Sequence, residues 1–367
     1  MRTSRLVDVL GTRRVAALDI GRFGACWYVM LFHAAIDTGS GATVLELGYA
    51  GVQFFMMLSG YVLARPYLEL RPQRPFELRR YAVGRVTRIL PPYYVVVLLA
   101  AVLAFLQVGV SATRVARGDL GWHVFTHLTL THSLFPATHR SLLAVLWSLG
   151  LEWQYYLVLP LLLLAFRAWK ALPIMLVVIV TTLVARAALP AVAPPGSDLM
   201  NGFFLARWTE FAAGVCVAAL LGQGWGHSRL LALAIALGAA GFSWSRGSND
   251  REIAVQGIVL VSFVLLRLYG PVTAVRPWTR AMQFLGEVSY STYLVHTLGG
   301  EMLFALFARL PATVALGPWP RILLYAVAGQ IAGIAFYFLV ERPTTRLAAG
   351  VLDRRARPVV GSARLSV

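Results

Sequence analysis

Long apolar stretches recur along the whole chain, separated by short polar connections. The bilayer core is about 30 Å thick, and a helix needs about 20 apolar residues to cross it. Most of the stretches approach that length, so the pattern predicts an all-α, polytopic membrane helix bundle with about ten transmembrane helices. The stretches are 18–37, 46–64, 90–110, 142–166, 171–189, 203–221, 230–245, 253–268, 281–308 and 321–340.

The stretches differ in how clearly they predict a helix. Residues 91–110 and 322–340 carry no charge, and residues 141–166 carry only Glu152. The charge-free parts of two others, 171–185 and 253–266, are short for the bilayer core, so each could be tilted or half-inserted. Totals of nine or eleven spans therefore stay open.

Composition and charge agree with a membrane protein. The 367 residues are 58% hydrophobic and 13% charged, whereas soluble domains carry about 25% charged residues. If ten spans alternate in direction, 24 of the 33 Lys and Arg residues fall on the side of the N-terminus, which the positive-inside rule makes cytoplasmic. The net charge of +17 is therefore a topology signal, and we expect no nucleic-acid partner. The expected organisation is a cytoplasmic segment 1–16, a membrane domain 17–345 and a basic cytoplasmic tail 346–367.

Ionisable residues inside apolar stretches are costly in a membrane, so each is a functional candidate. In the first stretch, Arg22 and His33 are 11 residues apart, which returns to nearly the same helix face after a rise of roughly 16 Å. Asp37 follows His33 by one turn and could pair with it, orienting the imidazole as a general base. The alternatives are an arginine that extends to the membrane surface and a histidine that only packs.

Glu152 lies ten residues into another apolar stretch, between Trp147 and Trp153. The aromatic residues could form a platform for a sugar, whereas the carboxylate could also be a structural partner of an arginine on another helix. Arg207 and Glu210 have the spacing of an ion pair on a helix surface. For a third polar set we expect structural or supporting roles: Glu287, His296 and Glu301.

Arginines accumulate just before the stretch that begins at residue 90. Arg80, Arg85 and Arg88 lie there, and guanidinium groups bind phosphates with two parallel hydrogen bonds. A topology signal or a contact with anionic lipid would give the same composition.

Four histidines of the segment 111–140 have a spacing that is also seen in metal sites. Cysteines are missing from this segment and Asp119 is its only carboxylate, so we expect a polar loop and no metal site. The histidines are His123, His127, His132 and His139.

Taken in order, several motifs resemble the bacterial integral-membrane acyltransferase 3 family over nearly the whole chain. They are the Arg-x10-His element at Arg22 and His33; GVQFFMMLSGY at 51–61; RVTRILP with Arg85 and Arg88; WSLGLEWQYY around Glu152; and SYSTYLVH followed by a closing ERP triplet. Gln53 departs from the family pattern, which often has an acidic residue there, so a role for that acid is in doubt here.

The resemblance implies an O-acyltransferase of the bacterial cytoplasmic membrane. Its donor would be an acyl-CoA, with acetyl-CoA as the default, and its acceptor a hydroxyl of a carbohydrate or glycolipid at the outer face. Taken together with the residue arguments above, we expect the catalytic residues to be His33, Asp37 and Glu152, and the CoA-binding residues to be Arg22, Arg80, Arg85 and Arg88. Membrane lipids are the other expected partners.

Two other classes of membrane protein could use the same buried charges. A transporter would use them as a proton or substrate path, but the sequence shows no pair of matching halves. A polyprenyl-linked glycan polymerase or ligase generally needs large outer loops, and the largest expected loop here is only 111–140.

Overall fold

A computed structural model describes residues 15–39, 43–73, 75–107, 115–192, 199–248, 251–271, 273, 276–307 and 317–347. These residues form helices and connections and contain no strand. The expected all-α class is therefore confirmed. The expected terminal segments, 1–16 and 346–367, lie almost entirely outside the described residues.

The helices follow one another with short connections. They are α1 (Ala16–Asp37), η1 (Thr43–Tyr49), α2 (Ala50–Arg65), η2 (Pro66–Leu70), α3 (Leu78–Phe105), α4 (Leu120–Leu128), η4 (His132–Leu134), η5 (Ala144–Leu146), α5 (Trp147–Ala168), α6 (Ala171–Val192), α7 (Leu199–Gly202), α8 (Phe204–Gly222), α9 (His227–Ser248), α10 (Arg251–Tyr269), α11 (Pro277–Glu287), α12 (Ser289–Phe307), α14 (Pro318–Phe336) and η6 (Tyr337–Glu341).

Eight helical stretches of the described residues are long and apolar enough to cross a membrane. The two other expected spans correspond to α1, which carries Asp19 and Arg22, and to α12. The single helix expected over 281–308 is instead two helices, α11 and α12, which meet at Val288. Next to the break, α11 approaches α1 so closely that a Cβ on Gly286 would come 1.8 Å from the Asp19 carbonyl oxygen.

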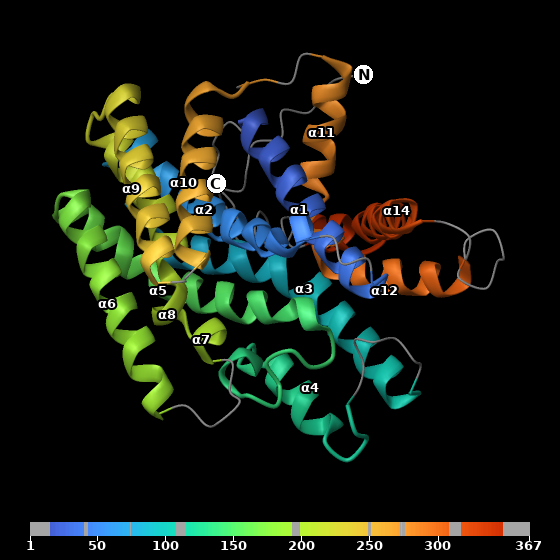
Figure 1. Ribbon diagram of the computed structural model, residues 1–367. Coiled ribbons are helices and arrows are strands. Elements are labelled where there is room, and N and C mark those ends of the chain that lie inside the picture. The colour runs from blue at the N-terminus through green and yellow to red at the C-terminus, as the bar shows by residue number, and fades with distance from the viewer. Residues whose placement is uncertain are drawn as a thin grey trace, which may run out of the picture.

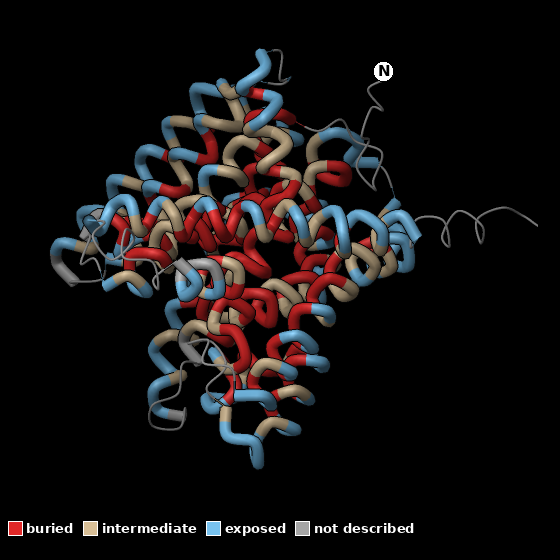
Figure 2. Tube along the Cα trace, turned by 90° about the vertical axis from the view of Figure 1, so that its right-hand side faces the viewer, coloured by how far each residue is buried: buried red, intermediate tan, exposed pale blue. Residues whose placement is uncertain are grey.

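The centre of the bundle is formed by α2, α3 and α5, with α6, α9 and α10 on one side and α12 and α14 on the other (Figure 1). Buried residues concentrate in this centre (Figure 2). At the contact of α2 with α8, a Cβ on Gly60 would lie 2.0 Å from the Phe211 carbonyl oxygen, and one on Gly214 would lie 1.9 Å from that of Met57. Small residues let membrane helices approach this closely.

The outer helices α6, α9 and α10 have a different character. Less than a third of the residues in the apolar part of each helix are buried, whereas two thirds are buried in the segments that contain α2 and α8. Their large exposed side chains include leucine, isoleucine, valine and aromatic residues. In a membrane these surfaces contact lipid chains, so the three helices form a lipid-facing wall around the packed centre.

Candidate active site

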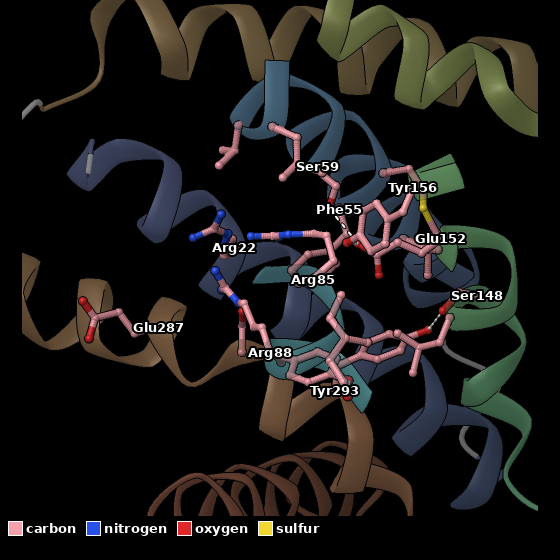
Figure 3. A pocket seen from close by; sticks show the side chains of 18 residues that line it. Arg22, Phe55, Ser59, Arg85, Arg88, Ser148, Glu152, Tyr156, Glu287 and Tyr293 are labelled. Atoms are coloured by element: carbon pink, nitrogen blue, oxygen red, sulfur yellow. Dashed lines mark hydrogen bonds between the residues drawn. The ribbon is translucent and has the colours of Figure 1, made fainter. Parts of the chain in front are cut away.

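Three arginines from distant parts of the chain converge on one cavity of about 110 Å³. Arg22 comes from α1, and Arg85 and Arg88 come from α3; their side chains extend into the same space (Figure 3). Glu152 of α5 lines the same cavity. We call this cavity the arginine pocket, defined by these four residues. The structure thus brings together most of the residues that the sequence suggested for donor binding, although their roles stay predictions.

The guanidinium of Arg22 is held in place by an acidic residue one turn earlier. Its Nη1 lies 2.6 Å from Asp19 Oδ1, and Asp19 is buried, with 2% exposed. Gln283 of α11 donates a second hydrogen bond to Asp19, at 3.4 Å. Arg22 is therefore fixed at the wall of the pocket. This position does not fit the alternative of an arginine that only extends to the membrane surface.

Arg85 differs from Arg22 in its pairing. Among the residues that the structure describes, no carboxylate lies within ion-pair distance of Arg85. The pocket is lined by the three arginines and by two carboxylates, of Glu152 and Glu287. Its lining therefore has a formal excess of positive charge, which favours an anionic ligand.

Glu152 is held by hydroxyl groups. Ser59 of α2 donates a hydrogen bond to Glu152 Oε1 at 2.8 Å, and the hydroxyl of Tyr156 donates to the same oxygen. Tyr81 in turn donates to the Tyr156 carbonyl oxygen at 3.0 Å. Within the described part of the chain Glu152 forms no ion pair, so the interpretation as a structural partner of an arginine is not supported by this geometry.

His33 lies beyond the arginine pocket and does not line it. Its ring centroid is 5.3 Å from that of His296 of α12. His296 is fully buried, and its Nδ1 lies 2.9 Å from the Tyr293 carbonyl oxygen. Tyr293 itself lines the pocket, with its ring 5.8 Å from His296 and its hydroxyl 2.7 Å from Ser148 Oγ (Figure 3). Tyr293 and His296 therefore connect the pocket with His33.

Two expected site residues lie elsewhere. The Asp37 carboxylate accepts a hydrogen bond of 2.6 Å from Tyr325 of α14, and no described hydrogen bond joins Asp37 to His33. The reason is that Asp37 ends α1, where its side chain meets α14 instead of turning back along its own helix. Arg80 is exposed and is not among the residues of the arginine pocket.

Several residues at the pocket were not assigned a role from the sequence. Ser59 and Tyr156 hydrogen-bond to Glu152, and Tyr293 lies between the pocket and His296. Ser59 and Tyr293 belong to the motifs that carry the resemblance, which was the only available signal for them. Gln53, at the position where the family often has an acid, is 1% exposed and does not line the pocket.

The expected ion pair between Arg207 and Glu210 forms, with Arg207 Nη2 3.4 Å from Glu210 Oε1. It does not lie on a helix surface as expected, because the two side chains are only 9% and 3% exposed. Burial is possible because Glu252 of α10 also binds Arg207, at 2.6 Å.

The histidines between α3 and α5 form a buried stack. The rings of His127 and His132 are parallel within 11°, with centroids 4.1 Å apart. Burial lowers the pKa of His127 to about 4 and that of His132 to about 3, so both are neutral at neutral pH. Among the described residues, no group of three or more His, Cys, Asp or Glu could hold a metal ion. His127 and His132 therefore pack against each other as neutral rings in this connection.

Comparison with known proteins places the whole arrangement in a family. The family model described as an acyltransferase domain matches residues 15–338. The exopolysaccharide production protein ExoZ of Rhizobium meliloti is 27% identical, over 89% of this chain and all of its own length. The acyltransferase MdmB of Streptomyces mycarofaciens is 29% identical, over 98% of this chain and 95% of its own length.

A third relative is matched over part of its length. The peptidoglycan O-acetyltransferase OatA of Listeria monocytogenes is 28% identical, over 45% of this chain and 27% of its own length. No solved structure matches the chain. The family model covers nearly all described helices, so the chain belongs to the acyltransferase 3 family and is a multi-pass membrane O-acyltransferase.

Proposed function

We propose that this O-acyltransferase moves an acyl group, with acetyl as the default, from cytoplasmic acyl-CoA to a carbohydrate hydroxyl at the outer face of a bacterial cytoplasmic membrane. The observation that carries the proposal is the convergence of Arg22, Arg85 and Arg88 on one pocket. Membership of an acyltransferase family argues against the transporter and the glycan ligase, neither of which would form a new ester.

The donor proposal rests on charge. Coenzyme A is a polyanion, and guanidinium groups bind phosphate in a bidentate manner. Arg85 has no ion-pair partner among the described residues and could bind a phosphate without first breaking a pair. The volume of 110 Å³ is below the usual range for ligand pockets of about 300 to 1,000 Å³. A CoA molecule would therefore have to displace side chains of the pocket, with Tyr293 as the residue between its thioester and His33.

The reaction requires one base and one positioned hydroxyl. His33 accepts the proton of the acceptor hydroxyl while the oxygen attacks the thioester carbonyl carbon. The C–O ester bond forms, the C–S bond breaks, and the CoA thiolate takes up a proton, which His33 can return. Glu152, held by Ser59 and Tyr156, orients the sugar or supports the charge that develops on the base.

The acceptor proposal rests on the relatives. Two of them are named for exopolysaccharide production and for O-acetylation of peptidoglycan. Both names point to a carbohydrate outside the cytoplasm, so we propose an exopolysaccharide repeat, an O-antigen or a lipid-linked sugar for this chain.

The test is acyl transfer by the purified protein in proteoliposomes that contain labelled acetyl-CoA. Slow release of labelled acetate without acceptor, and transfer to glycans from the source cells, would support the proposal. In parallel, mass spectrometry of surface glycans from cells with and without the protein should show the loss of one acyl mass. Binding of acetyl-CoA without hydrolysis or transfer would contradict it.

A further inference from the structure

A second and larger cavity, of about 430 Å³, lies between α6, α8, α9 and α10. Helix α2 lies between the two cavities, because Met56 lines the arginine pocket and the next residue, Met57, lines the larger one. We call the larger one the lateral cavity. Its volume is within the range of small-molecule sites. The residues that matter for its chemistry are Thr182, Leu183, Arg186, Glu210, Leu237 and Gln256.

The rim of the lateral cavity is apolar and exposed. Leu183 of α6 is 55% exposed, Leu237 of α9 is 44% exposed and Trp244 of α9 is 63% exposed. These helices form the lipid-facing wall, so the rim lies where acyl chains of the bilayer would touch it. Hydrocarbon could therefore enter the cavity from the membrane without crossing water.

The inner surface of the same cavity is polar. Glu210 is buried, with 3% of its side chain exposed. Gln256 donates a hydrogen bond to Glu210 Oε1 at 3.0 Å, and Thr209 donates to Oε2 at 3.3 Å. A glutamine amide has two N–H donors and one acceptor oxygen, and in the described part of the chain only one of the donors is used. Polar groups at this depth are costly, and a groove that only accommodates lipid chains has no need of them.

The charges around the polar surface compensate one another. Arg207 binds both Glu210 and Glu252, at 3.4 and 2.6 Å, and Arg186 binds Glu252 at 3.1 Å. Within these described ion pairs, the two arginines and the two glutamates balance in formal charge. A phosphate or carboxylate would have to compete with an existing ion pair. An uncharged group with hydroxyls could instead hydrogen-bond to Gln256 and Glu210 and leave the ion pairs intact.

We propose that the lateral cavity binds a neutral amphiphile with a hydroxylated head group, such as an uncharged glycolipid. The head group hydrogen-bonds to Gln256 and Glu210, and the hydrocarbon chain leaves between Leu183 and Leu237 toward the bilayer. This is a binding site separate from the arginine pocket, and the proposal does not depend on the acyl-transfer step.

The experiment is native mass spectrometry of the full chain, released from nanodiscs that contain equal amounts of three lipids. These are monoglucosyl diacylglycerol, diacylglycerol with the same chains, and phosphatidylglycerol. We expect the glucolipid to remain bound at least about tenfold more than either of the others, which corresponds to about 1.4 kcal/mol.

Variants locate the binding. Leu183→Trp fills the rim and Gln256→Leu removes the amide, and each should reduce retention of the glucolipid by about tenfold. Leu176→Trp is the matched control, because Leu176 lies on the same helix, is 61% exposed and does not line the cavity. It should leave retention unchanged.

Preferential retention of phosphatidylglycerol would overturn the proposal, and so would equal effects of Leu183→Trp and Leu176→Trp. A third contrary outcome is a dimer of the chain without bound lipid that Leu183→Trp dissociates, because a second copy of the chain would then cover the rim. Adding acetyl-CoA then identifies the source of the ligand. A gain of one acetyl mass on the bound glucolipid marks it as an acceptor, whereas an unchanged mass marks a resident lipid. Either result supports the site, because retention is measured without catalysis.

Discussion

The arginine pocket and the lateral cavity share the wall formed by α2 but differ in charge. In the lateral cavity, both neighbouring arginines are engaged by Glu210 or Glu252. In the arginine pocket, Arg22 is paired with Asp19, whereas Arg85 has no such partner in the described part of the chain. The number of arginines near a cavity therefore does not indicate its ligand. The carboxylates that face them decide whether an anion can bind.

The largest expected effect concerns the histidine beyond the arginine pocket. His33→Ala should lower acyl transfer by about 100- to 10,000-fold, because it removes the proposed general base. The measurement is turnover in proteoliposomes, with circular dichroism to show that the helices are retained. His227→Ala is the control, since His227 is exposed and far along the chain, at the start of α9. Wild-type turnover in His33→Ala would show that His33 is not the general base.

The next effect concerns the ion pairs behind the lateral cavity. Arg207→Met should reduce the free energy of unfolding by about 3 to 5 kcal/mol, because it leaves the buried carboxylate of Glu210 without its cation and removes one of the two arginines that bind Glu252. The measurement is chemical unfolding of the detergent-solubilised protein.

Arg186→Met is the graded control for Arg207→Met. The side chain of Arg186 is 26% exposed and lies 3.1 Å from Glu252. Water screens an ion pair that is partly exposed, so the expected loss is about 1 kcal/mol or less. Equal losses in the two variants would show that the network does not depend on Arg207, and the contrast between the two cavities would weaken.

A smaller effect is expected for donor binding. Arg85→Ala should raise the KM for acyl-CoA by about 10- to 100-fold, because a hydrogen bond to a charged group contributes about 1.5 to 3 kcal/mol, with a smaller change in kcat. Arg79→Ala is the control, since Arg79 is exposed and does not line the pocket. An unchanged acyl-CoA titration in Arg85→Ala would assign Arg85 to topology or to anionic lipid.

The smallest expected effect is a difference in salt dependence between the ligands of the two cavities. Raising the ionic strength from 0.1 to 1 M shortens the Debye length from about 10 to about 3 Å. We expect the KM for acyl-CoA to rise about threefold over this range, while glucolipid retention in the lateral cavity stays constant. Both measurements use the same purified protein. A fall in glucolipid retention alongside the rise in KM would mean that the lateral cavity also binds its ligand through net charge.

Much of the fold could be predicted because a bilayer imposes one length and one polarity on each span. The bounds of α5 and α14 lie within a few residues of stretches that carry little or no charge. Helix α3 instead begins 12 residues before the predicted stretch 90–110 and includes the arginines that precede it. The break between α11 and α12 was not predicted, since the apolar stretch 281–308 continues across it. Nor was the approach of Gly286 to the Asp19 carbonyl oxygen of another helix. Hydropathy along one helix contains no information on that contact.

The candidate site divides in the same way. Charged groups inside spans are costly, so hydropathy already indicates which residues must be functional or paired, and the motifs single out Arg22, His33, Arg85 and Glu152. Their partners depend on how the helices pack. Asp37 contacts Tyr325, His33 lies beside His296, and the charge of each cavity depends on carboxylates from other helices. Spacing along a helix determines which face a residue occupies, but packing determines what that face meets.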